Sequence, residues 1–253
     1  MSHTHWLLLF AAGIAGGLTG SIAGLASVAT YPALLAVGLP PVTANVTNTV
    51  ALVFNAIGSM WGSRPELAGQ GRWLWRMAPV AALGGGVGAA LLLTTPAEGF
   101  EKIVPWLLAF SALTIALPRS QLADADPEAP ARTGVLFAQA AAIFAIAIYG
   151  GYFGAAAGVV LLAMLLRAGH ATLAHANAAK NVLLGASNLT AAVAFGFLAP
   201  VHWASVVPLG LGCLLGSRLG PVVVRHTPTT PMRILIGLGA LALAVKLGID
   251  AYT

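Results

Sequence analysis

Long stretches with few or no charged residues dominate this chain and limit the environments in which it can fold. Only 8% of its 253 residues are charged, and 58% are hydrophobic. A soluble domain carries about 25% charged residues. So few charges cannot cover a water-facing surface, and lipid must therefore contact most of the molecule. The sequence predicts an all-α integral membrane protein.

Ten apolar segments can be traced along the chain. They lie approximately at 6–20, 28–37, 42–62, 73–93, 103–117, 135–150, 153–166, 173–197, 203–223 and 232–247. The one long polar stretch divides them into two sets of five. We therefore predict an N-terminal repeat at residues 1–118, a cytoplasmic linker at 119–132 and a C-terminal inverted repeat at 133–253.

The first two segments of each set form one apolar stretch. This stretch is too long to cross the membrane once as a straight helix, and it is short for two full crossings. Residues 6–38 are apolar for roughly 50 Å of helix, whereas the hydrocarbon core is about 30 Å thick. Gly20, Gly24 and Ala26 interrupt this stretch, and glycines also interrupt 135–166. Each stretch is either one bent helix or a pair of short helices that forms a hairpin or re-entrant unit.

The distribution of basic residues favours the hairpin. If each stretch enters the membrane and returns, nine arginines fall on one side, against Lys102 and Lys246 on the other. The nine are Arg64, Arg72, Arg76, Arg119, Arg132, Arg167, Arg218, Arg225 and Arg233. If each stretch crosses once, the division is six against five, which is no bias. We therefore place the linker in the cytoplasm and both termini on the outer side.

Short motifs recur in the two halves in the same order, which predicts the repeat. The recurring features are the glycine spacing of 17–24 and 151–158, the pair Asn48 and Asn55 with its match Asn181 and Asn188, and Trp73 with Pro79 against Trp203 with Pro208. Because each half has an odd number of segments, the second half is inserted upside down. In inverted-repeat transporters, paired broken helices mark a binding site near the midplane. The alternative is that duplication only produced a stable, closely packed bundle.

Polar residues in the eighth segment indicate a substrate site, because such groups are costly in a membrane. Lys180 lies roughly 10 Å deep in this segment. Asn177, Asn181 and Asn188 share a narrow arc beside it. An ammonium group with neighbouring amides suits a desolvated anion. The alternative is a lysine that snorkels to the cytoplasmic headgroups.

The third segment and the first break supply the other candidate ligands. Those in the third segment are Asn45, Asn48, Thr49 and Asn55. These side chains bind substrate or bond across helices. Ser21 and Ser27 flank the break, where the backbone N–H groups at a helix start could hold an anion, or where the hydroxyls bond back to their own helix.

Other classes of function lack support in the sequence. No His-Glu-x-x-His or Gly-x-Ser-x-Gly motif occurs, and no Asp or Glu lies inside a segment. The basic residues are scattered and form no stripe that could bind a nucleic acid. We therefore expect no enzymatic activity, cofactor, metal or nucleic-acid partner. The expected partners are the lipid bilayer, a small anionic substrate and a second copy of the chain in a homodimer.

Several of these motifs resemble the sulfite exporter TauE/SafE family. Residues 30–52 look like its first repeat, and 61–67 (WGSRPEL) is similar to its Trp-Gly-Tyr-Arg-Arg-Glu-Leu. The second repeat is matched by YGGYFG at 149–154, ANAAKN at 176–181 and PVHW at 200–203. Within ANAAKN, the family's Asn-x-x-Lys-Asn maps onto Asn177, Lys180 and Asn181.

The resemblance implies a secondary transporter or exporter of sulfite, a sulfonate or a similar small sulfur-containing anion in the bacterial cytoplasmic (inner) membrane. Where the family has a Pro-Gly stretch, this chain has Asn55, which adds a hydrogen-bond donor. The competing function is a membrane scaffold or assembly protein with no substrate of its own.

Overall fold

The computed structural model describes residues 2–116, 133–167 and 172–226, together with residues 245 and 249. All the secondary structure within these residues is helical. The helices are α1 (His3–Ala23), α2 (Ala26–Ala36), α3 (Pro41–Gly62), α4 (Arg64–Leu67), α5 (Gly71–Thr94), α6 (Ala97–Ala116), α7 (Thr133–Tyr152), α8 (Ala157–Arg167), α9 (Leu173–Leu198) and α10 (Trp203–His226). The linker at 119–132 and the tenth segment, except residue 245, lie outside the described residues.

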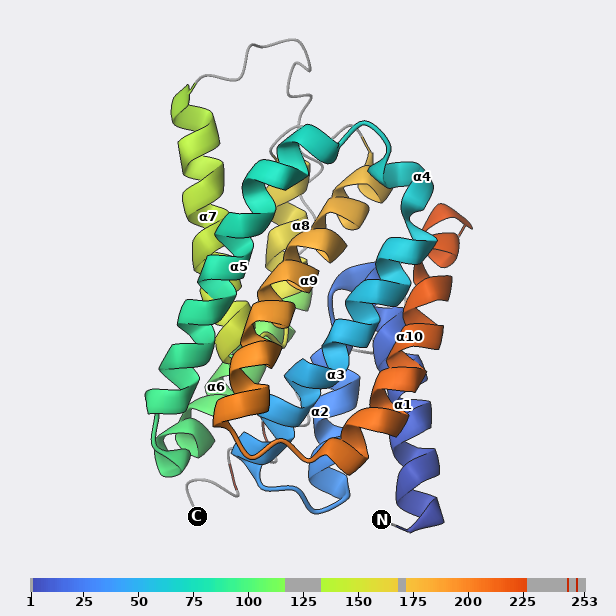
Figure 1. The fold of residues 1–253 in the computed structure, drawn as a ribbon, viewed down its shortest axis with the longest axis vertical. Coiled ribbons are helices and arrows are strands. Elements are labelled where there is room, and N and C mark those ends of the chain that lie inside the picture. The colour runs from blue at the N-terminus through green and yellow to red at the C-terminus, as the bar shows by residue number, and fades with distance from the viewer. Residues whose placement is uncertain (1, 117–132, 168–171, 227–244, 246–248, 250–253) are drawn as a thin grey trace.

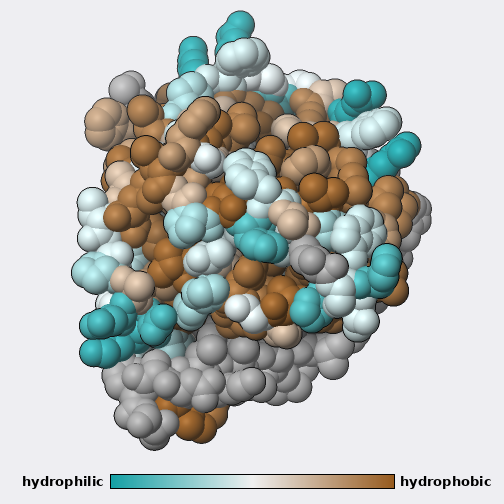
Figure 2. Space-filling view, turned by 60° about the horizontal axis from the view of Figure 1, so that its bottom comes forward, coloured by the Kyte–Doolittle hydropathy of each residue, from teal (hydrophilic) through white to brown (hydrophobic). Residues whose placement is uncertain are grey.

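The helices have the length and the surface of membrane spans. Five of them, α1, α5, α7, α9 and α10, are long and apolar enough to cross a bilayer. Trp75, Phe137 and Phe197 are each at least 79% exposed, which is unfavourable in water but not in lipid. Figure 2 shows a broad band of apolar side chains, with hydrophilic groups at its upper edge and on the end turned forward. The prediction of an all-α integral membrane protein is confirmed.

Each half of the chain begins with a long helix followed by a short one. The 21 residues of α1 make about 31 Å of helix, enough for one crossing, whereas the 11 residues of α2 make only about 16 Å. A break separates α1 from α2 at Gly24, where φ is 77°, and another separates α7 from α8 at Gly154, where φ is 70°. Left-handed backbone of this kind favours glycine. The structure refines the sequence prediction, because only the second helix of each pair is short.

The helix pairs α1–α2 and α7–α8 are hairpins that enter the bundle from opposite ends (Figure 1). At one end, an apolar core joins Leu9 near the start of α1 to Leu34 near the end of α2. At the other end, a second core joins Ile143 in α7, Leu165 near the end of α8 and Leu74 near the start of α5. Each short helix therefore returns toward the end where its hairpin began, which agrees with the hairpin alternative.

The two hairpins contact each other at their glycines. A Cβ added to Gly24 would collide with the Cα of Gly158, and a Cβ added to Gly158 would collide with the Cα of Gly24. Around them, α1 packs on α10 and α10 on α3, while α7 packs on α5 and α5 on α9. This pairing is compatible with an axis that exchanges α1 with α7, α3 with α9 and α10 with α5. The inverted repeat itself stays a prediction.

Candidate functional site

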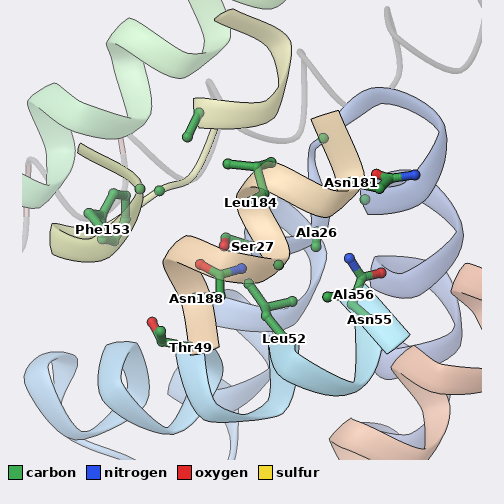
Figure 3. Close-up of a pocket in the computed structure, with 16 residues that line it drawn as sticks. Ala26, Ser27, Thr49, Leu52, Asn55, Ala56, Phe153, Asn181, Leu184 and Asn188 are labelled. Carbon is green, nitrogen blue, oxygen red and sulfur yellow. The ribbon is translucent and has the colours of Figure 1, made fainter. Parts of the chain in front are cut away.

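A small cavity lies between the two breaks and helices α3 and α9 (Figure 3). The volume of the cavity that the centres of water-sized groups can occupy is about 40 Å³. One water needs about 10–15 Å³ of such space, so the cavity holds about three such groups. A small oxyanion has this size. The polar wall of the cavity comprises Ser27, Thr49, Asn55, Asn181 and Asn188, and the breaks contribute Gly20, Gly24, Gly150 and Gly154.

Two amides on this wall have no hydrogen-bond partner within the described part of the chain. Asn55 lies on α3 and Asn188 on α9, each seven residues after another asparagine. The Oδ1 atom of Asn55 is buried and makes no hydrogen bond. Buried polar groups are nearly always hydrogen-bonded, so this acceptor on a cavity wall calls for a donor such as water or a protonated ligand, whereas the Nδ2 group of the same amide is the one that could donate to an anion. Asn55 and Asn188 are the residues best placed to bind one.

The start of α2 adds a positive electrostatic potential to the same cavity. No side chain caps α2, and its first residues, Ala26 and Ser27, line the cavity. The first backbone N–H groups of a helix lack intrahelical partners and carry partial positive charge. Asn48 fixes this helix start against α3, because its Nδ2 donates to Ser27 Oγ at 3.0 Å and its Oδ1 accepts from Thr30 Oγ1 at 2.6 Å. Asn48 does not line the cavity itself, but its hydrogen bonds fix the position of the α2 residues that do.

Lys180 is fully buried, so the snorkelling alternative is wrong. Its ammonium group donates to the backbone carbonyl of Gly20 at 3.0 Å and to that of Ser21 at 3.4 Å, both in the last turn of α1. Lys180 is not on the cavity wall, but Gly20 is. The ammonium group therefore lies just behind the wall and neutralises the negative end of the α1 dipole.

Two amides of α9 join Lys180 on the same turn of α1. Asn177 Nδ2 donates to the Ser21 carbonyl at 2.8 Å, and Asn181 Nδ2 approaches it at 3.4 Å. Asn181 also lines the cavity, whereas Asn177 does not. Asn181 thus connects the cavity wall to this group of donors.

The ten predicted site residues therefore divide into two sets of five. Ser27, Thr49, Asn55, Asn181 and Asn188 line the cavity, whereas Ser21, Asn45, Asn48, Asn177 and Lys180 do not. Asn45 Nδ2 donates to the Tyr152 carbonyl at the end of α7, at 2.8 Å. The Ser21 hydroxyl bonds back to Leu18 within its own helix, at 3.0 Å. In these two cases the structure shows the helix-bonding alternative.

Sequence reasoning missed the apolar side of the cavity. Leu52, Phe153 and Leu184 line it opposite or between the amides (Figure 3). Leu184 lies three residues after Asn181 and four before Asn188, so helical spacing could have placed it on the same face. The signal for Phe153 is its position in the YGGYFG motif at 149–154, within the glycine-interrupted stretch.

The bundle and its cavity define the class of the protein. Membrane-spanning helices that surround a polar cavity between paired broken helices are the arrangement of a small membrane transporter. Among the described residues, no cluster of three or more His, Cys, Asp or Glu side chains could hold a metal ion.

Comparison of the sequence with known families identifies the family. The sequence model of the sulfite exporter TauE/SafE family matches residues 9–247. The chain therefore belongs to the TauE/SafE family, and this membership makes it a multi-pass membrane transporter.

Several curated proteins match this chain over nearly their whole length, and each is named as a probable transporter. A probable membrane transporter protein, ORF9, of a Sinorhizobium species is 28% identical over 96% of this chain and 92% of its own. A probable membrane transporter protein of Haemophilus influenzae is 26% identical over 96% and 94%, respectively. The probable membrane transporter protein YfcA of Escherichia coli K12 is 28% identical over 97% and 90%. No solved structure gives a significant match.

Proposed function

We propose that the chain is a secondary transporter that moves sulfite, a sulfonate or a similar small sulfur-containing anion through the cavity between its two halves. The observation that carries this proposal is the pair Asn55 and Asn188, two amides that line a membrane-embedded cavity and lack a protein partner among the described residues. Amide N–H groups supply directed hydrogen bonds to oxygen atoms. A scaffold protein without a substrate would give no reason for them.

The charges around the cavity support an anion rather than a cation. Among the described residues, no Asp or Glu lines the cavity. The uncapped start of α2 faces it, and the Lys180 ammonium group lies behind Gly20. In a medium of low dielectric constant, these positive groups lower the cost of desolvating a negative ligand.

The positions of the basic residues support an assignment of which end of the bundle faces the cytoplasm and which faces the outer side. Arg64 in α4, Arg72 and Arg76 near the start of α5, and Arg218 in α10 belong to the end of the bundle at the top of Figure 1. Lys102 lies near the start of α6, at the opposite end. By the positive-inside rule, the arginine-rich end is cytoplasmic, and α1 begins on the outer side of the inner membrane.

Flux measurements in proteoliposomes test the proposal. We expect uptake of labelled sulfite or of a small sulfonate by the parent protein, and at least tenfold slower uptake by Asn188→Leu and by Asn55→Leu. A hydrogen bond to a charged group contributes about 1.5–3 kcal/mol, which corresponds to a factor of about ten or more. Neither substitution removes a protein hydrogen bond among the described residues, so the folded state should be little affected. Leu189→Ala, on the lipid-facing side of α9, is the matched control.

Two outcomes would contradict the proposal in different ways. If the parent transports no small anion, the scaffold function is favoured. If the parent transports sulfite and both leucine variants match it, these amides do not bind the substrate.

A further inference from the structure

One aromatic side chain closes the cavity on the side away from the arginine-rich end. Phe153 lines the cavity at the break between α7 and α8, and only 2% of it is exposed (Figure 3). The backbone N–H groups of Phe153 and Gly154 both bond to the Tyr149 carbonyl at 3.0 Å. The last turn of α7 therefore fixes the point at which the ring enters the cavity wall.

Two further rings support Phe153 on its far side. The ring of Tyr31 meets it edge to face, with centroids 5.3 Å apart, and that of Phe100 lies 5.9 Å away at 66°. Both rings belong to the apolar core that also contains Leu9 near the start of α1. Three packed rings thus lie between the cavity and the end of the bundle where α1 begins.

The other break has no such ring at the matching position. Phe153 directly precedes the left-handed Gly154, and Ala23 directly precedes the left-handed Gly24. The side chain of Ala23 is only a methyl group, which is too small to close the cavity as a ring does. Aromatic closure at the residue before the left-handed glycine is therefore a feature of the α7–α8 break.

We propose that Phe153 is the gate that separates the cavity from the outer end of the bundle. A charged ligand cannot cross three packed aromatic rings without a large desolvation cost. The ring must therefore move before an anion enters or leaves on that side. The side chain next to a glycine-containing break is the one that can move without displacing a whole helix. The identity of the ligand rests on the proposed function, but the closure itself does not.

Access to a cysteine in the cavity tests this gate without requiring any transport. The chain has a single cysteine, the buried Cys213, so Cys213→Ala gives a cysteine-free background. Asn188→Cys then places one thiol on the cavity wall. A small membrane-impermeant thiosulfonate is added to one side of sealed vesicles at a time, and the rate of labelling is measured.

We expect slow labelling from the outer side, at least tenfold faster labelling from that side in Phe153→Ala, and an intermediate rate in Phe153→Leu. Phe153→Leu keeps an apolar side chain and remains informative if the alanine variant fails to fold. Phe137→Ala, a lipid-exposed change in the preceding helix α7, should leave the rate unchanged.

Fast outer labelling of the parent, equal rates in parent and Phe153 variants, or acceleration only from the cytoplasmic side would each overturn the gate. Because these rates do not depend on flux, a protein that transports no sulfite could still confirm the gate. Normal sulfite transport with equal labelling rates would refute the gate alone.

Discussion

The two helix breaks are built alike but stabilised differently. At the first break, three side chains of α9, including the Lys180 ammonium group, donate to backbone carbonyls in the last turn of α1. At the second break, the amide of Asn45 on α3 donates to the Tyr152 carbonyl. Both breaks turn at a left-handed glycine. The first break therefore depends on a charge, and the second on a neutral hydrogen bond.

If the proposed function holds, the difference shows how a membrane protein can place a helix end beside an anion. The last carbonyl groups of a helix carry about half a negative charge, and lipid provides no water to solvate them. Gly20 belongs to the last turn of α1 and also lines the cavity, so an uncompensated helix end there would repel a negative ligand. Lys180 removes that repulsion without occupying the cavity.

Removal of the charge should have the largest effect. Lys180→Met keeps much of the side-chain volume but leaves buried carbonyls of α1 without their ammonium donor. We expect a loss of about 3 kcal/mol in the free energy of unfolding and at least a hundredfold loss of sulfite flux. Thermal unfolding in detergent and proteoliposome flux measure the two effects. Lys102→Met, at an exposed position in α6, is the control. A Lys180→Met protein that is as stable as the parent would show that the first break does not need its charge.

Disruption of the contact between the two hairpins should have the second-largest effect on stability. Gly158→Ala places a methyl group against the Cα of Gly24 and must push the two breaks apart. Overpacking of this kind costs about 1–3 kcal/mol. Gly134→Ala is the matched control, because a Cβ there meets nothing within 4 Å. Equal unfolding temperatures for the two variants would mean that the breaks do not lock together.

Loss of the neutral hydrogen bond should have the smallest effect. Asn45→Ala removes one amide from the Tyr152 carbonyl, and we expect a loss of about 1 kcal/mol. Thermal unfolding is compared with that of Thr43→Ala, a control in the first turn of α3. If Asn45→Ala destabilises the protein as much as Lys180→Met, the contrast between the two breaks is wrong.

The hairpins could be predicted from the sequence because their causes are local. Gly24 lies in the middle of an apolar stretch that is too long for one crossing, and the arginines then select the topology. The depth of Lys180 in its segment favoured burial over snorkelling, and the structure shows it buried. Its partner did not, because a sequence does not show which element faces a given side of a helix. Lys180 and Asn181 differ by about 100° around α9. One of them reaches α1 from behind the wall, and the other lines the cavity.

The glycine motif was informative about contacts but not about conformation. Its spacing matches Gly24 with Gly158, and these two residues do contact each other. The left-handed residues, however, are Gly24 and Gly154, which the same spacing does not match. Which glycine adopts a positive φ depends on where the preceding helix ends. At the second break, the bonds from Phe153 and Gly154 to the Tyr149 carbonyl fix that point.

The polar character of α3 has a consequence for biogenesis. Although α3 has 22 residues, it is not among the described helices apolar enough to cross a bilayer alone. A translocon that sorts nascent segments by hydrophobicity would not retain α3 by itself. Asn48 is bonded to α2 within the first half, but the amide of Asn45 finds its partner at the end of α7 only after the second half has begun to be synthesised. When the N-terminal half is made alone, α3 should therefore integrate less efficiently than α1 or α5, and its insertion should be completed only after α7 has been synthesised.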